Sequence, residues 1–303
     1  MSIMNEYLIF LGKDEMPSFL EKYLSVPSLL RLKKIGYFCG MDYASKDVYD
    51  FTEYISRYDH SLSVALLTWK FTQNKRATIS ALFHDISSPC FSHVIDYMNK
   101  DYSEQESTEE YTLDILKNDL YFLECLKSDN IDLSEIDFKK YEIVDNKRPR
   151  LCTDRLDGVI LTGMFWVKNL SFQDAKRIVN DIEVYNLDEK QEIGFKSNDI
   201  LKLVLRVNEE IDIFCHSKED NYMMELLAHI TKEAIDKNII KYSDLFILDE
   251  IELFNIFDSS NDKGILNKLY KFRNIKVKDI PDIELSDVKI RILKPIVQGI
   301  RIG

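Results

Sequence analysis

Apolar residues recur three or four positions apart along most of the chain, and this spacing places side chains on one face of a helix. His60, Val64, Leu67 and Phe71 follow it in one segment. A short extended start followed by a helix is expected within residues 1–24. Further helices are predicted within residues 45–73, 75–100, 151–168 and 171–245. The pattern therefore predicts a mostly α fold.

The last part of the chain has a different pattern. Residues 274–280 alternate between apolar and polar side chains, and residues 289–297 also have the composition of a strand. Alternation with a period of two is typical of β-strands. We therefore expect a helical domain at residues 1–250 and a small α+β appendage at residues 251–303.

Composition narrows the functional classes. The 303 residues include only 9 glycines and 6 prolines, which argues against an all-β or glycine-rich α/β fold. The formal net charge is −12, and phosphate backbones and anionic membranes favour cationic protein surfaces. Extended nucleic acid and membranes are therefore not expected as partners. The negative net charge does not exclude a small anionic substrate, because a locally positive pocket or a bound metal can hold phosphate on an acidic protein.

The cysteines and the N-terminus indicate a cytoplasmic protein. The five cysteines are far apart and form no CxxC pair, so we expect reduced thiols rather than disulfides or structural zinc. The N-terminus has no basic segment followed by a long apolar run, and no stretch approaches the ~20 apolar residues of a membrane span.

The stretch from Ala81 to Asp96 carries the first candidate chemistry. His84 and Asp85 are adjacent and end an apolar run, and Pro89 follows shortly after. Proline disfavours helix at the residue before it, so the helix is expected to break just after Asp85. An imidazole and a carboxylate at a helix end can bind one divalent metal ion. A His-Asp dipeptide also occurs by chance, so further ligands are needed.

Two other helices offer such ligands. His60 opens the buried face of its helix, where an isolated histidine can simply pack or cap. Asp154 and Asp157 lie three residues apart at the start of another helix. Acidic residues also suit a helix N-terminus for electrostatic reasons.

The order of His60, His84, Asp85 and Asp154 on successive helices resembles the HD-domain metal-dependent phosphohydrolase superfamily. The resemblance is closest to its deoxynucleotide-triphosphohydrolase-like branch and covers roughly residues 25–245. It also includes an Arg-x-x-His-Ser-Leu-x-Val helix, an extended His-Asp signature and the segment around the last aspartate, at residues 57–64, 84–93 and 151–157.

The resemblance implies a helical HD-domain bundle that binds one divalent metal ion, either Mn, Fe, Zn, Ni or Co. The four residues would be its ligands. It further implies that metal-activated water attacks phosphorus in a nucleotide or another small phosphorylated molecule. Homo-oligomers are common among such proteins, so a homo-oligomer is a possible state of this chain.

The resemblance suggests further roles around the metal. Arg57, Arg155 and Arg148 are candidates for phosphate binding, because a guanidinium binds phosphate through two hydrogen bonds. Each arginine could equally pair with an acidic neighbour. Candidates for proton transfer are His93, Asp96 and Glu109.

Departures from the branch pattern change the expected chemistry. Ser88 stands where the branch has a second histidine, and Glu109 stands where it has another. These changes favour a single metal over two. Gly158 replaces a tyrosine, which weakens the expectation of deoxynucleotide recognition. A degenerate HD module that binds a nucleotide or partner protein without turnover is the alternative, and a purely structural helical protein is the third possibility.

Overall fold

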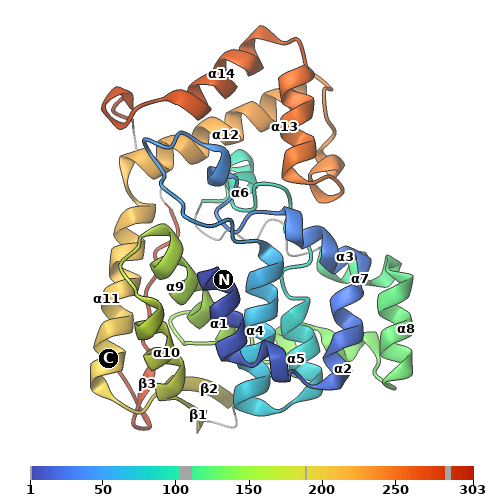
Figure 1. Ribbon diagram of the computed structural model, residues 1–303, viewed down its shortest axis with the longest axis vertical. Coiled ribbons are helices and arrows are strands. Elements are labelled where there is room, and N and C mark those ends of the chain that lie inside the picture. The colour runs from blue at the N-terminus through green and yellow to red at the C-terminus, as the bar shows by residue number, and fades with distance from the viewer. Residues whose placement is uncertain (1, 103–110, 188–189, 284–287) are drawn as a thin grey trace.

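The computed structural model describes residues 2–102, 111–187, 190–283 and 288–303. They form mostly helices and one small four-stranded sheet, so the predicted mostly α fold is confirmed (Figure 1). No helix within these residues is both long and apolar enough to cross a membrane.

Helix α4, Arg57–Thr72, lies at the centre of the first half of the chain. It begins at a capping box in which Ser56 and Asp59 bond to each other's backbone N–H groups. Ten of its sixteen residues are buried, because α1, α3, α5 and α9 all pack against it. The other helices described in this half are α1 Ile3–Leu11, α2 Ser18–Glu21, α3 Pro27–Arg31, α5 Lys75–Leu82, α6 Val94–Asn99, α7 Thr112–Asn118 and α8 Leu120–Ser128.

The second half surrounds this group from two sides. Helices α11 and α12 are the longest of the described helices, and α12 continues towards α13 and α14 at one end of the molecule (Figure 1). The helices here are α9 Thr153–Leu161, α10 Phe172–Asp181, α11 Asn198–Cys215, α12 Lys218–Asp236, α13 Glu250–Ser259 and α14 Lys263–Asn274.

The sheet corrects the prediction that residues 171–245 form only helices. Strands β1, Ile182–Leu187, and β2, Lys190–Phe195, form an antiparallel hairpin. Strand β3, Ile296–Val297, pairs parallel with β2, and β4, Ile300–Arg301, completes the sheet. Gly194 permits the pairing, because a Cβ atom there would collide with the backbone oxygen of Ile296. The hairpin was missed because its short alternating runs lie between strongly helical segments.

Three other expectations about local structure were wrong. The chain starts as a helix rather than extended, since Ser2 caps α1 at Ile3. Residues 274–280 form the end of α14 and a 3-10 turn, in which Ile275 and Ile280 are buried while Val277 is exposed. Only residues 296–297 of the second expected strand lie in the sheet.

The residues after 250 lie against two separate parts of the helical body. Helix α14 packs on α12, and the end of the chain joins the sheet begun by β1 and β2. The domain boundary at residue 250 stays a prediction.

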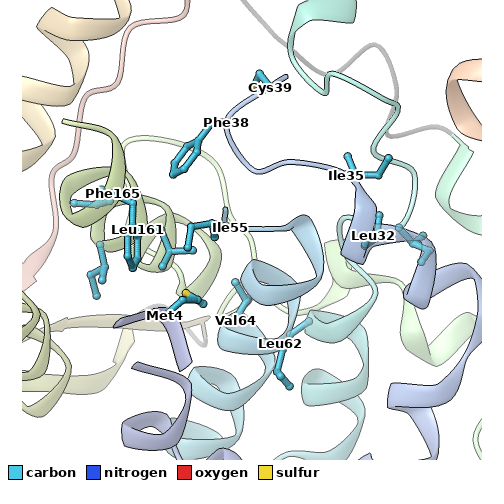
Figure 2. Close-up of a cluster of buried hydrophobic side chains, with 14 of the residues drawn as sticks. Met4, Leu32, Ile35, Phe38, Cys39, Ile55, Leu62, Val64, Leu161 and Phe165 are labelled. Carbon is cyan, nitrogen blue, oxygen red and sulfur yellow. The ribbon is translucent and has the colours of Figure 1, made fainter. Parts of the chain in front are cut away.

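A buried apolar cluster holds α1, α4 and α9 together with the loop after α3. Figure 2 shows Met4 of α1, Val64 of α4 and Leu161 of α9 converging beneath Ile55 and Phe38. All five are buried. Phe38 also stacks on Phe51, with ring centroids 4.4 Å apart, and meets Trp166 edge-on at 5.2 Å. This packing fixes the loop that carries Tyr37 against the first turn of α4.

Replacing Phe38 with alanine should strongly destabilise the protein. The ring is fully buried, and Phe→Ala substitutions in cores cost about 3–5 kcal/mol of unfolding free energy through lost transfer energy and a cavity. Urea unfolding followed by circular dichroism measures the change. Tyr270→Ala is the control, because this ring is 71% exposed and should change the free energy by less than about 0.5 kcal/mol.

Candidate metal centre

His60 is held by a buried carboxylate on another helix. Its Nδ1 lies 2.8 Å from Oδ2 of Asp157 in α9, and a carboxylate oxygen accepts, so Nδ1 donates. Asp157 also accepts from the Ser63 hydroxyl at 2.5 Å and from the Tyr7 hydroxyl at 2.9 Å. Without a metal, Nε2 lies 3.1 Å from Oδ1 of Asp154 and donates to it. Because Asp157 keeps a proton on Nδ1, loss of the Nε2 proton would leave the Nε2 lone pair for a metal ion.

His84 is oriented by the backbone. Helix α5 ends at Leu82, three residues earlier than predicted, and His84 lies on the following turn. Its Nδ1 donates to the carbonyl oxygen of Ala81 at 2.7 Å. The buried Nε2 has no hydrogen-bond partner among the described residues. A buried polar atom without a partner is costly, so this nitrogen is available to a ligand.

Asp154, in the first turn of α9, brings the two histidines to one point. The ligand atoms of His60, His84 and Asp154 all lie within 4.8 Å of one another. The His84 Nε2 to Asp154 Oδ1 distance is 3.4 Å. Ligand atoms bound at about 2.1 Å to one metal ion are roughly 3–4 Å apart, so the three residues fit a divalent ion. The Asp154 side chain is 33% exposed, which leaves the centre accessible from that side.

Asp85 lies at the edge of this group. Its carboxylate oxygens are 3.9 Å from Nε2 of His60 and of His84. One of them, Oδ2, accepts from Nη1 of Arg57 at 2.8 Å. Burial alone would raise the pKa of Asp85, but Arg57 and the two histidines hold it below its usual range.

Without a metal, the centre holds protons. Burial opposes the charged form of His60, yet hydrogen bonds to Asp154 and Asp157 raise its pKa to about 10. The pKa of Asp154 is well below its usual range, because both histidines offset the effect of burial. A metal ion that binds Nε2 of His60 must displace a proton, so binding is expected to release protons into the buffer.

The three candidate phosphate ligands have different surroundings. Arg57 is buried and pairs with Asp85, and its Nε donates to Ser92 Oγ at 3.1 Å. Arg155 is occupied by the loop before α9: its guanidinium donates to backbone and side-chain oxygens of Asp145, Asn146 and Arg150. Arg57 and Arg155 therefore each pair with an acidic neighbour, which is the alternative to phosphate binding that the sequence left open.

Arg148 differs from the other two. It lies exposed on the loop that Arg155 holds. Within the described part of the chain it makes no hydrogen bond or ion pair. Partial desolvation and the like charges of Arg155 and Arg291 lower its pKa to about 10, so it is still a cation at neutral pH. Arg148 is thus free to bind an anion near Asp154.

Two of the three candidate proton-transfer residues, His93 and Asp96, lie at the start of α6. His93 Nδ1 and Asp96 Oδ2 are 2.9 Å apart. The Asp96 side chain is buried, whereas that of His93 is 42% exposed. His93 makes no hydrogen bond to His60, His84 or Asp154 within the described ranges. The third candidate, Glu109, lies outside the described residues.

A second cluster of possible ligands shares Asp154. Asp145 and Cys152 also place ligand atoms within 4.8 Å of it and of each other. Burial raises the pKa of the Cys152 thiol to about 12, so it stays protonated at neutral pH, and metals bind the thiolate. Asp145 is already paired with Arg155 at 3.3 Å. The histidine-containing cluster is therefore the better metal centre.

Sequence reasoning missed part of the support of this centre. From sequence, Asp157 could be explained as an acidic residue that suits a helix N-terminus, but in the structure its carboxylate binds His60. Ser63 lies one turn after His60, and this spacing could have indicated a shared partner. Tyr7 gave no signal, because it is 150 positions from Asp157 in the sequence.

Comparisons with known proteins point in the same direction. No protein-family model matches the sequence. The chain is 27% identical over 274 residues to "Uncharacterized protein YdhJ" of Bacillus subtilis, covering 86% of this chain and 77% of that protein. It is 25% identical over 134 residues to "Metal-dependent phosphohydrolase cns2" of Cordyceps militaris, covering 44% of this chain and 38% of that protein. The chain is therefore a distant homologue of a protein named as a metal-dependent phosphohydrolase.

Replacing Asp157 with asparagine should weaken metal binding. The amide can present its NH2 group to Nδ1 of His60, which favours the tautomer that carries the proton on Nε2. Loss of such an outer partner typically costs 10–100-fold in metal affinity. Titration of the metal-free protein with Mn(II) or Zn(II) in a calorimeter measures the dissociation constant.

Two variants test which cluster binds. Cys152→Ser should leave the affinity unchanged, whereas His84→Ala should abolish stoichiometric binding. The opposite pattern would place the ion at Asp145 and Cys152 and contradict the assignment.

Proposed function

We propose that this chain is an HD-type metal-dependent phosphohydrolase that acts on a nucleotide or another small phosphorylated molecule. The main support is the arrangement of His60, His84 and Asp154. Both imidazoles are locked with Nδ1 as donor, and both Nε2 atoms face one carboxylate oxygen. The distant similarity to a protein named as a phosphohydrolase is the second support. Membership of the deoxynucleotide-triphosphohydrolase-like branch belongs to the proposal.

The chain would hold the metal through His60, His84 and Asp154, with Asp85 at the edge. When bound, a divalent ion lowers the pKa of water and polarises a phosphoryl oxygen. Arg57 keeps Asp85 ionised and in place through their 2.8 Å ion pair.

Phosphate would be bound by Arg148. Arg148 is exposed and forms no ion pair among the described residues, although it feels the charge of Asp154. Arg155 makes at least four contacts with the loop of residues 145–150, and thereby fixes the backbone that carries Arg148. In this arrangement Arg148 binds the phosphate of the substrate, and Arg155 positions the loop that carries Arg148.

Proton transfer to the leaving group would use the His93–Asp96 pair. The hydrogen bond to the buried Asp96 orients the ring. Because the His93 side chain is substantially exposed, its other nitrogen can exchange a proton with substrate or solvent. Glu109 stays a further candidate from sequence.

A module that binds its ligand without turnover is the second candidate function. Ser88, at the position of the branch's second histidine, is buried, with 9% of its surface exposed. A hydroxyl group does not replace an imidazole as a general acid at neutral pH. The following experiment separates the two candidates.

Wild-type protein loaded with Mn(II) should hydrolyse at least one compound of a panel of nucleoside mono-, di- and triphosphates. Release of phosphate, pyrophosphate or triphosphate is measured by chromatography. His84→Ala should lower kcat at least about 100-fold, because electrostatic stabilisation at the reacting group is worth that much in enzymes. Asp174→Asn is the control and should keep full activity, because Asp174 is a partly exposed residue on α10 that belongs to none of the candidate sites. Metal binding and ligand-induced thermal stabilisation without any product would favour the binding module.

Arg148→Ala should raise KM for the hydrolysed compound about tenfold or more with a smaller change in kcat. A hydrogen bond to a charged group contributes about 1.5–3 kcal/mol, and a contact made equally in ground and transition states changes KM alone. Arg150→Ala is the matched control on the same loop, since Arg150 pairs with Glu142 at 2.6 Å. Equal effects of the two variants would indicate general disturbance of the loop and contradict a phosphate contact at Arg148.

A further inference from the structure

The buried Arg57 is held between two loops. On one side, its Nε donates to Ser92 Oγ at 3.1 Å. On the other side, its guanidinium carbon lies 5.2 Å from the ring centroid of Tyr37, and this ring in turn lies 5.1 Å from that of His60. The position of Arg57, and through it of Asp85, therefore depends on where these loops place Ser92 and Tyr37.

The Tyr37 loop runs antiparallel to the entry of α4. Gly36 and Ser56 form an isolated β-bridge. The Tyr37 N–H donates to the carbonyl of Ile55 at 2.8 Å, and the Arg57 N–H donates to that of Ile35 at the same distance. The backbone at Gly36 thus sets the distance between Tyr37 and Arg57.

The Ser92 loop has an unusual backbone. Phe91 and Ser92 both have positive φ, at 65° and 45°. Non-glycine residues rarely adopt this left-handed conformation, and it persists only when the surroundings enforce it. The Phe91 N–H donates to Oε1 of Glu250 at 3.2 Å, so this carboxyl group helps to enforce it.

Glu250 contacts both loops. It is the first residue of α13 and is fully buried. Its Oε1 accepts from the Phe91 N–H, whereas its Oε2 lies against Gly36 and forms no hydrogen bond among the described residues. A Cβ atom on Gly36 would lie 3.0 Å from Oε2 of Glu250 and 2.8 Å from Oδ2 of Asp42, so only glycine permits this close approach. One carboxyl group therefore hydrogen-bonds to the residue before Ser92 and packs against the residue before Tyr37.

The acceptor oxygen Oε1 of Glu250, rather than its charge, makes the hydrogen bond to Phe91. Burial and the nearby Asp42 raise its pKa to about 8. At neutral pH the group is then mostly protonated, and an amide side chain of the same shape is a fair substitute for it.

We propose that Glu250 is a positioning residue for Arg57: it hydrogen-bonds to the backbone of Phe91, packs against Gly36, and thereby fixes Ser92 and Tyr37 on either side of the guanidinium. The consequence for the rate rests on the proposed phosphohydrolase function, whereas the consequence for the geometry of Arg57 does not.

The geometric part is tested by NMR on protein labelled with [15N]arginine. The Nε–H signal of Arg57 is identified by its absence in Arg57→Lys. In Glu250→Ala we expect this signal to shift and its hydrogen exchange to accelerate at least about tenfold, because the bond to Ser92 is loosened. An unchanged signal would overturn the proposal whether or not the protein is an enzyme.

Asp249→Ala is the matched control at the same end of α13. It removes the N-cap and the 2.8 Å ion pair with Lys34, but not the contacts of Glu250. Both variants should lower the melting temperature, and only Glu250→Ala should change the Arg57 signal. Equal changes in both would mean that the helix end as a whole is responsible, and would overturn a specific role of Glu250.

The kinetic part uses a double-mutant cycle with the hydrolysed compound. Glu250→Ala should lower kcat/KM about 10- to 100-fold, since small misplacements remote from the chemistry have effects of this size. In an Arg57→Ala background the same substitution should have less than about a twofold effect, because residues that act through one another are not additive. Full additivity would overturn the proposal.

Two further variants keep the test decisive. Glu250→Gln retains an acceptor oxygen and should restore both the Arg57 signal and the rate to within about twofold of wild type. A glutamine variant as impaired as alanine would overturn the role given to the acceptor. If Glu250→Ala does not fold, Glu250→Asp replaces it, because the side chain shortened by one methylene withdraws from the Phe91 N–H and from Gly36.

Discussion

The hydrogen bonds around the buried carboxylate of Asp157 are the interaction on which the candidate site depends. Burying a carboxylate costs several kcal/mol unless donors surround it. Tyr7 of α1, and His60 and Ser63 of α4, supply those donors to this residue of α9. The same three helices share the buried apolar cluster of Met4, Val64 and Leu161 (Figure 2). Packing and hydrogen bonding therefore support each other: the helices must meet for the donors to converge, and the donors fix the ring of His60.

A second constraint is charge balance among buried groups. Asp85 is kept ionised by Arg57 and the histidines, and Asp154 by the histidines. Arg57 in turn depends on Ser92 and Tyr37. A buried network of this kind is stable when every group is paired, and the loss of any member leaves a buried polar group unpaired at a cost in free energy. The buried Nε2 of His84 is a gap in this pairing among the described residues, and a metal ion would fill it.

The local sequence predicted the structure correctly where a clear helical period coincided with histidine or aspartate residues that can bind a metal. Helix α4 was predicted from its period, and His60 from its position at the start of the buried face. His84 and Asp154 were predicted as partners of His60, and the structure brings the three together. The hairpin of β1 and β2 was missed, because six-residue strands between amphipathic helices carry too few residues to define a period. Arg155 was identified as a cation near the site, but its engagement with the loop of residues 145–150 depends on a fold of that loop that no pattern reveals.

By itself, the sequence determined the mostly helical fold and the order of the candidate ligands, because periodicity and residue type are local properties of the chain. Only the tertiary structure decided which groups support them. Asp157 meets Tyr7 across 150 positions, and Glu250 meets Phe91 across 159. These contacts form only after the helices have packed, since neither partner is near the other until the apolar faces are buried. The pairing of β3 with β2 at the end of the chain also depends on the tertiary structure. It requires the absence of a side chain at Gly194, where the backbone of Ile296 approaches closely.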